Sequence, residues 1–213
     1  MPSRCEDSKW TRSFINLRLL VTLNSDWGEM LSKASRLLAN DHREVDKVLR
    51  KLEIALEAED VDSVYASLDL LWARLAVHIR AEHLHLFPAV LTASQKSEQL
   101  PRADEAQTAI AKLREDHDFF MHELANAVTH MREIRSVSEA QVVRATLKVV
   151  ARIVGEVKQR LTEHNEAEEM QVYRWLASMR DPAELAKLAS RVSAELGNRP
   201  PRFTKNVWRV AAE

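Results

Sequence analysis

The sequence contains little glycine. Only three of its 213 residues are glycine, whereas globular proteins contain about 7%. Strand-rich folds use glycine in tight turns and bulges, and nucleotide-binding loops use it where the backbone approaches a phosphate. The chain has no G-x-G-x-x-G or Walker-type loop. The scarcity of glycine therefore disfavours both of these classes and favours a helical protein.

Cysteine, long apolar runs and net charge are also scarce. The single cysteine, Cys5, excludes an internal disulfide framework and zinc sites built on paired cysteines, and it suits a reducing compartment. The longest apolar stretches, such as 19–23, are far shorter than the roughly 20 residues of a membrane helix. The N-terminus does not resemble a secretory signal, and a formal net charge of −1 gives no basic patch for nucleic acid. We therefore expect a soluble, cytoplasmic protein with no membrane span and no nucleic-acid partner.

Apolar residues recur at three- and four-residue steps, which is the period of helices with one buried face. Capping signals and short polar connections divide this pattern into five helices. The expected ranges are 29–57, 63–87, 101–134, 138–180 and 181–197. Capping boxes are expected at Asp26 and Ser138, and Pro88 should end or kink the second helix. Asp181 followed by Pro182 marks the start of the fifth helix.

Four long helices joined by short loops predict an all-α fold, an antiparallel up-down-up-down four-helix bundle over 29–180. A short fifth helix and a tail fill 181–213. The segment 1–28 has apolar residues at helical spacing, so it forms either an N-terminal arm across the bundle or a helix on a membrane surface. The buried face of the fourth helix should include Trp175. Gly155, earlier in the same helix, should allow a neighbouring helix to approach closely.

Each of the four long helices has one histidine on its apolar face. These are His42, His78, His117 and His164. Core positions normally hold Leu, Val, Ile or Ala, because burying an unpartnered polar group costs roughly 1–3 kcal/mol. A lone histidine could be a satisfied core residue, but one on each helix indicates a shared site. A bundle without metal is the alternative, and it would leave all four histidines unpartnered.

Two of these histidines are followed by a glutamate one helical turn later. The pairs are His78-x-x-x-Glu82 and His164-x-x-x-Glu168. Residues four apart lie on one face, about 6 Å apart along the axis, so each pair can reach one metal ion or two adjacent ions. The pairs repeat at a constant offset of 86 residues, and the other two histidines each follow an aspartate, Asp41 and Asp116. The chain is therefore expected to form two pseudo-symmetric halves.

Four imidazoles and two carboxylates suit iron or manganese. If both glutamates bridge two ions, the glutamates supply four bonds, the histidines four and an oxo or hydroxo bridge two. Two six-coordinate ions then keep two of twelve positions open for a small ligand. Zinc usually takes four ligands and would leave some of these groups unpaired. A ferritin-like design with Glu-x-x-His on two helices is a further alternative, but only Glu82-x-x-His85 fits it.

These residues resemble the hemerythrin-like, or HHE, family of non-haem di-iron proteins. The resemblance rests on His42, on HIRAEHLHLFP at 78–88, on Asp116-His117 and on HNEAEE at 164–169, and it covers about residues 35–177. It implies two bridged iron ions that bind O2 or a related small oxidant such as NO or peroxide. The four histidines would be terminal ligands, and Glu82 and Glu168 would be bridges.

The chain departs from the oxygen carriers of this family at their fifth histidine. Met121 stands at that position, one turn after His117, which favours a more open iron and sensing or redox chemistry. His122 is rotated about 140° past the facing direction and could substitute only through a helix bulge. His83 stands where many members have a second glutamate. His122 and His83 are the two candidates for a fifth ligand.

The remaining polar residues near the motifs receive simpler interpretations. His85 and His130 are expected at the surface or behind the ligands, and Asp46 is expected in solvent. Asp41 and Asp116 should be rotated off the buried face as ordinary surface charge. The function stays open between reaction with a small oxidant, an iron or redox sensor acting through an unknown protein partner, and iron–sulfur-centre repair, for which Cys5 is a thin match.

Overall fold

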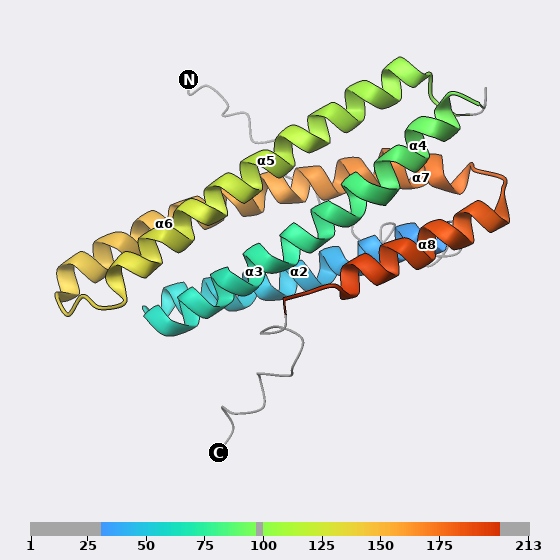
Figure 1. Cartoon of the computed structure of the whole chain (residues 1–213). Coiled ribbons are helices and arrows are strands. Elements are labelled where there is room, and N and C mark those ends of the chain that lie inside the picture. Colours follow the sequence, from blue (N-terminus) through green and yellow to red (C-terminus); the bar gives the residue numbers. More distant parts are fainter. Residues whose placement is uncertain (1–30, 97–99, 201–213) are drawn as a thin grey trace, which may run out of the picture. The chain divides into compact units, whose positions relative to one another are not determined.

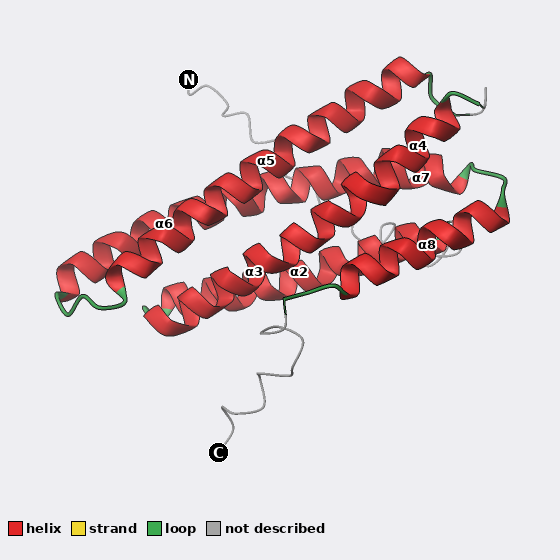
Figure 2. Ribbon diagram, viewed as in Figure 1, coloured by secondary structure: helices red, strands yellow, loops and turns green. Residues whose placement is uncertain are grey.

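The computed structural model describes residues 31–96 and 100–200, and all regular structure in these ranges is helical (Figure 2). The segments are α2 (Lys33–Glu57), α3 (Val61–Ala81), η1 (Glu82–Leu86), α4 (Phe87–Ser94), α5 (Ala103–Ile134), α6 (Ala140–Ala167), η2 (Glu168–Val172), α7 (Tyr173–Ala177) and α8 (Pro182–Gly197). The all-α expectation is confirmed for this part of the chain. The expected arm over 1–28 and the end of the tail lie outside the described residues. None of the described helices is long and apolar enough to cross a membrane.

The long helical segments pack around one core. Neighbours along the chain pack together, α2 with α3, α3 with α5 and α5 with α6, and α6 also contacts α2 (Figure 1). The core is built from the apolar faces that the sequence predicted, with Leu52, Leu71, Leu124 and Val150 fully buried. Each such side chain stabilises the fold by about 1.5–3 kcal/mol relative to an exposed position. The arrangement is that of a helical bundle.

The fifth helix, α8, lies on the outside of this core, against α2, α3 and η1. Asp181 caps it as expected, because its carboxylate accepts hydrogen bonds from the backbone N–H groups of Ala183 (2.9 Å) and Glu184 (3.2 Å). The capping box expected at Ser138 was wrong. The N-cap of α6 is Glu139, one residue later, and its side chain makes no capping hydrogen bond. The capping box expected at Asp26 lies outside the described residues, and the N-cap of α2 is Ser32.

The second and fourth long helices each contain a π-helical turn. These turns, η1 and η2, begin at Glu82 and Glu168. Pro88 was expected to end or kink the second helix, and it does not end it, because helical structure continues to Ser94. Proline is tolerated there since the π turn already interrupts the regular hydrogen-bond pattern in front of it. Proline does not cause both π turns, because the position after the second π turn that is equivalent to Pro88 is Arg174.

A π turn adds one residue to the helical turn, so residues five apart then lie on one face. After Glu168 the buried positions are Val172, Tyr173 and Leu176, while Trp175 is only partly buried. The expectation that Trp175 lies on the core face was therefore wrong, because the π turn shifts the buried positions after Glu168 by one residue. The close helix contact expected at Gly155 was also wrong, because this residue is exposed and a Cβ there would meet nothing within 4 Å.

Candidate metal centre

All six residues predicted to bind metal come together inside the bundle. Both glutamates are fully buried, and the four histidines are 2–5% exposed. Their potential ligand atoms form two groups, each with all its atoms within 4.8 Å of one another. The groups are His42, His78, Glu82 and Glu168, and Glu82, His117, His164 and Glu168. Because both glutamates belong to both groups, this arrangement could hold two adjacent ions that share two carboxylates.

Three of the four carboxylate oxygens of the two glutamates lack the hydrogen bonds that buried carboxylates require. Glu82 Oε1 lies 2.8 Å from His78 Nε2, and Glu82 Oε2 lies 3.2 Å from His117 Nε2. Yet neither oxygen, nor Glu168 Oε1, has a hydrogen bond of acceptable direction with any described residue. An unpaired buried acceptor is costly. Close approach without hydrogen-bond direction is how donor atoms are arranged around a shared cation, so these residues fit a metal.

Carboxylates outside the cluster orient three of the histidines. Asp41 lies 3.1 Å from His78 Nδ1 and Asp116 lies 3.3 Å from His164 Nδ1. These contacts assign the N–H to Nδ1 and turn the Nε2 lone pair toward the cluster. Glu169 Oε1 lies 3.1 Å from Nδ1 of the third, His42.

The expectation that Asp41 and Asp116 are ordinary surface charge was wrong, since they are only 5% and 7% exposed. Each faces the neighbouring helix rather than solvent, and each meets an arginine there, Arg74 and Arg160 respectively. The repeated Asp-His doublet was the sequence signal for this role. It was present but could not be assigned without knowing which helices are neighbours.

The Nε2 atoms of the histidines face one another in pairs. His42 and His78 have their Nε2 atoms 3.1 Å apart, and His117 and His164 repeat the same distance. If all four rings are neutral with N–H on Nδ1, the lone pairs in each pair repel. A proton or a metal cation between them removes the repulsion. The two pairs are therefore suited to hold one cation each.

The pKa values around the cluster differ between the two pairs. Burial alone would lower the pKa of His42 and His78, but the Glu168 and Glu169 contacts of His42 and the Glu82 and Asp41 contacts of His78 raise both. The pKa of His164 is instead lowered, because burial and the neighbouring His117 outweigh its carboxylate contacts. In the metal-free protein, His42 and His78 therefore hold a proton more readily than His164.

The structure does not bring a fifth histidine into the ligand groups. His83 Nε2 lies 2.9 Å from His117 Nδ1, so His83 is a hydrogen-bond partner behind that ring. The His122 side chain is 81% exposed, and α5 continues as a regular helix without the bulge it would need. Met121 packs against the apolar core. His85 lies 4.0 Å from Glu195 rather than in the cluster, which removes the support for the ferritin-like alternative.

Tyr173 is a residue of the cluster that sequence reasoning missed. It is fully buried, and its hydroxyl donates to Glu168 Oε2 at 3.3 Å and lies 3.4 Å from His42 Nε2. Burial and the charges of Glu168 and Glu82 raise the pKa of Tyr173 well above its usual value. The offset of 86 residues could have found it, because Phe87 and Tyr173 each follow a cluster glutamate by five residues.

A small cavity of about 10 Å³ adjoins the four histidines. This is about the space of one water molecule. Its other lining residues are Val45, Leu75, Ile79, Phe120, Leu161 and Asn165. The lining is apolar except for Asn165, whose buried Oδ1 has no hydrogen-bond partner among the described residues. The site beside the four histidines is therefore tightly packed and holds little water.

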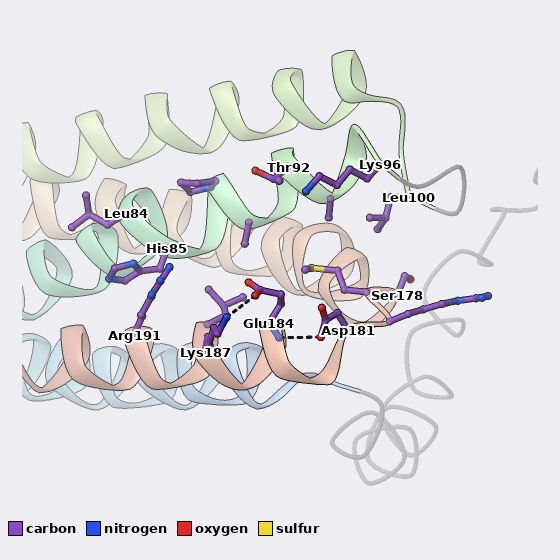
Figure 3. A pocket seen from close by; sticks show the side chains of 16 residues that line it. Leu84, His85, Thr92, Lys96, Leu100, Ser178, Asp181, Glu184, Lys187 and Arg191 are labelled. Carbon is purple, nitrogen blue, oxygen red and sulfur yellow. Dashed lines mark hydrogen bonds and ion pairs between the residues drawn. The ribbon is translucent and has the colours of Figure 1, made fainter.

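Larger hollows lie around the cluster, and two of them come near its residues. One, of about 500 Å³, opens between η1, α4 and α8 and includes His85 but none of the six predicted ligands (Figure 3). The other, of about 480 Å³, lies between α5 and α6 and reaches Asp116 and His164. On the opposite side, Arg199 lies 3.8 Å from Asp41.

Comparisons with known proteins agree with this geometry. The family model of the hemerythrin HHE cation-binding domain matches residues 33–176, from the start of α2 into α7. Searches of curated proteins and of solved structures found no match. The matched segment contains all six clustered residues and Tyr173.

Proposed function

Since the chain belongs to the hemerythrin HHE cation-binding domain family, we propose that it is a non-haem di-iron protein that binds or reacts with O2 or a related small oxidant. His42 and His78 would hold one iron, and His117 and His164 the other. Glu82 and Glu168 would bridge the two ions. The observation that carries the proposal is the pair of ligand groups that share both glutamates. Nitrogen and oxygen donors in this number suit iron.

The protein's own residues would orient the ligands and keep water out. Asp41 and Asp116 hold the rings of His78 and His164 through Nδ1. The small cavity beside the histidines, about the space of one water molecule, has a mainly apolar lining that keeps bulk water away. Bound iron would supply the affinity and redox chemistry toward O2, NO or peroxide that no protein side chain has. The structure supports binding of such a ligand, and we leave open whether turnover follows.

We further propose that the long helices form the antiparallel up-down-up-down bundle expected from the sequence. The packing of chain neighbours and the α2–α6 contact support this topology. A role as an iron or redox sensor is a second candidate function. It is favoured by the contact of α8 with η1, the turn that begins at Glu82. A change at Glu82 on metal binding would then alter how α8 is held.

Metal analysis of the anaerobically purified full-length protein tests the primary proposal. We expect about two iron ions per chain, and an oxo-bridge charge-transfer band that forms when the reduced protein meets O2, with a distinct spectrum under NO. His164→Ala should lower the iron content to one ion or fewer. His122→Ala is the matched control, since it removes an exposed histidine, and should leave the content unchanged. Less than one iron per chain in the wild-type protein would rule the proposal out.

A further inference from the structure

The two halves of the cluster differ in the aromatic ring closest to the metal positions. Tyr173 stacks on His42, with ring centroids 6.0 Å apart and 18° between the planes. Phe87 stacks on His117 at the same 6.0 Å and 12°. Both rings follow a π turn that starts at a cluster glutamate. The two halves therefore place an aromatic ring in the same way, and only one ring carries a hydroxyl.

The hydroxyl of Tyr173 lies at the spacing of a metal ligand. Adjacent donors of a six-coordinate ion with bonds of about 2.1 Å are about 3.0 Å apart. The Tyr173 oxygen is 3.3 Å from Glu168 Oε2 and 3.4 Å from His42 Nε2. Those two atoms are themselves 3.5 Å apart. The three atoms thus form a nearly equilateral triangle, which is the shape of one face of an octahedral coordination sphere, slightly expanded.

Resting on the di-iron function proposed above, we propose that Tyr173 is a further protein ligand of the ion held by His42 and His78. On metal binding its phenol releases the proton to solvent and its oxygen forms the bond to the ion, with no electron transferred. Phe87 has no oxygen to offer, so the corresponding position of the other ion stays open. The two open positions counted from the sequence then become one, at the His117–His164 ion.

A second asymmetry supports this location of the open position. Asn165 adjoins His164 in the lining of the small cavity, and its buried Oδ1 has no hydrogen-bond partner among the described residues. The equivalent residue of the other half, 86 positions earlier, is Ile79. Among the described residues that line the cavity, the one polar side chain apart from the histidines therefore lies beside the second ion. Tyr173 would be an additional protein ligand at the His42–His78 ion, not at the His117–His164 ion, where Met121 leaves the fifth histidine absent.

The matched pair of rings allows a symmetrical test. We would compare four full-length, iron-loaded, oxidised proteins: wild type, Tyr173→Phe, Phe87→Tyr and the double variant. The readouts are iron content, the phenolate-to-iron(III) absorption band, and the number of azide ions bound per chain. For the wild type we expect two iron ions, a phenolate band and one azide.

Each variant has a distinct expected result. Tyr173→Phe should keep two iron ions, lose the band and bind two azide ions. Phe87→Tyr should about double the band and lose azide binding. The double variant should regain the wild-type band and a single azide, because the phenol and the open position have exchanged places.

Other results overturn the inference. A Tyr173→Phe protein that keeps the phenolate band, or still binds a single azide, shows that Tyr173 is not a ligand, while its two iron ions leave the di-iron function standing. Fewer than two iron ions in the wild type would count against the di-iron function itself. If Tyr173→Phe does not fold, Phe87→Tyr decides, and an unchanged band with unchanged azide binding refutes the proposal.

Discussion

The two halves of the metal centre share their supporting residues and differ in the residues next to the metal positions. In each half an aspartate holds a histidine through Nδ1 and meets an arginine, and a π turn begins at the cluster glutamate. The residue after that glutamate is His83 in one half and Glu169 in the other, and the ring that follows is Phe87 or Tyr173. The supporting residues can be repeated because they only position ligands. The neighbouring residues differ, so the two proposed metal positions would be unequal.

The difference extends to charge. Glu169 contacts His42, whereas His83 contacts the equivalent ring, His117. An anion behind one imidazole raises its pKa, as found for His42. Burial, His117 and Arg114 lower the pKa of His83 itself. The contacts of His42 thus favour its charged form, whereas those of His83 favour its neutral form.

The largest expected contrast concerns the two supporting aspartates. Asp41→Ala should destabilise the metal-free protein by about 3–5 kcal/mol, because it leaves Arg74 charged and buried without its partner. Asp116→Ala should cost less, about 1–2 kcal/mol, because the Arg160 side chain is 40% exposed against 10% for Arg74. Urea unfolding of both variants measures the difference. Equal losses would show that the two supports are energetically the same.

The pH dependence of stability should have opposite sign in the two halves. The raised pKa of His78 means that its contribution is complete below the unfolded value of about 6.5 and is lost as pH rises through the folded pKa. The lowered pKa of His164 means that its contribution is present above about 6.5 and is lost as pH falls through the folded pKa. Each effect is at most about 1.4 kcal/mol per pH unit.

Unfolding of metal-free wild type, His78→Gln and His164→Gln between about pH 5 and pH 9 isolates these contributions. The stability difference between wild type and His78→Gln should shrink as pH rises above neutrality. The difference for His164→Gln should shrink as pH falls below it. Slopes of the same sign would contradict the opposite pKa shifts of His78 and His164.

A smaller contrast concerns the two residues beside the cavity. Asn165→Leu should weaken azide binding about fivefold, because it removes an amide whose N–H group can turn to donate a hydrogen bond to azide, worth about 1 kcal/mol. Ile79→Leu at the equivalent place is the control and should leave the azide dissociation constant unchanged. Titration followed by absorption measures both. An equal effect of the two substitutions would mean that the ligand does not favour the second ion.

The smallest expected effect concerns Gly155 in α6, a helix of the second half of the chain. Gly155→Ala should stabilise the protein by about 0.5–1 kcal/mol, because alanine restricts the unfolded chain and favours the helix. A Cβ there meets nothing within 4 Å. Gly197→Ala, at the end of α8, is the control and should gain less, since helix ends are less constrained. Thermal unfolding compares the two, and a destabilised Gly155→Ala protein would revive the close contact expected from the sequence.

The helices and the six clustered residues were predictable from the sequence because both depend on local periodicity. His117 is four residues after Leu113 and three before Phe120, so it must lie on the same face as both in any regular helix. The same reasoning failed at Trp175 and Tyr173, because it assumed a regular turn where the structure has a π turn. A one-residue insertion in the turn rotates everything after it by about 100°.

The sequence by itself determined the helical class, the one histidine on each long helix and the twofold repeat of His-x-x-x-Glu. Only the tertiary structure decided that Asp41 and Asp116 are buried behind ligands, that His122 stays in solvent, and that the hydroxyl of Tyr173 enters the cluster. The physical reason is the range of the interactions. Helical periodicity is set by hydrogen bonds four residues apart, whereas a side chain's partners are set by whichever helix packs against it.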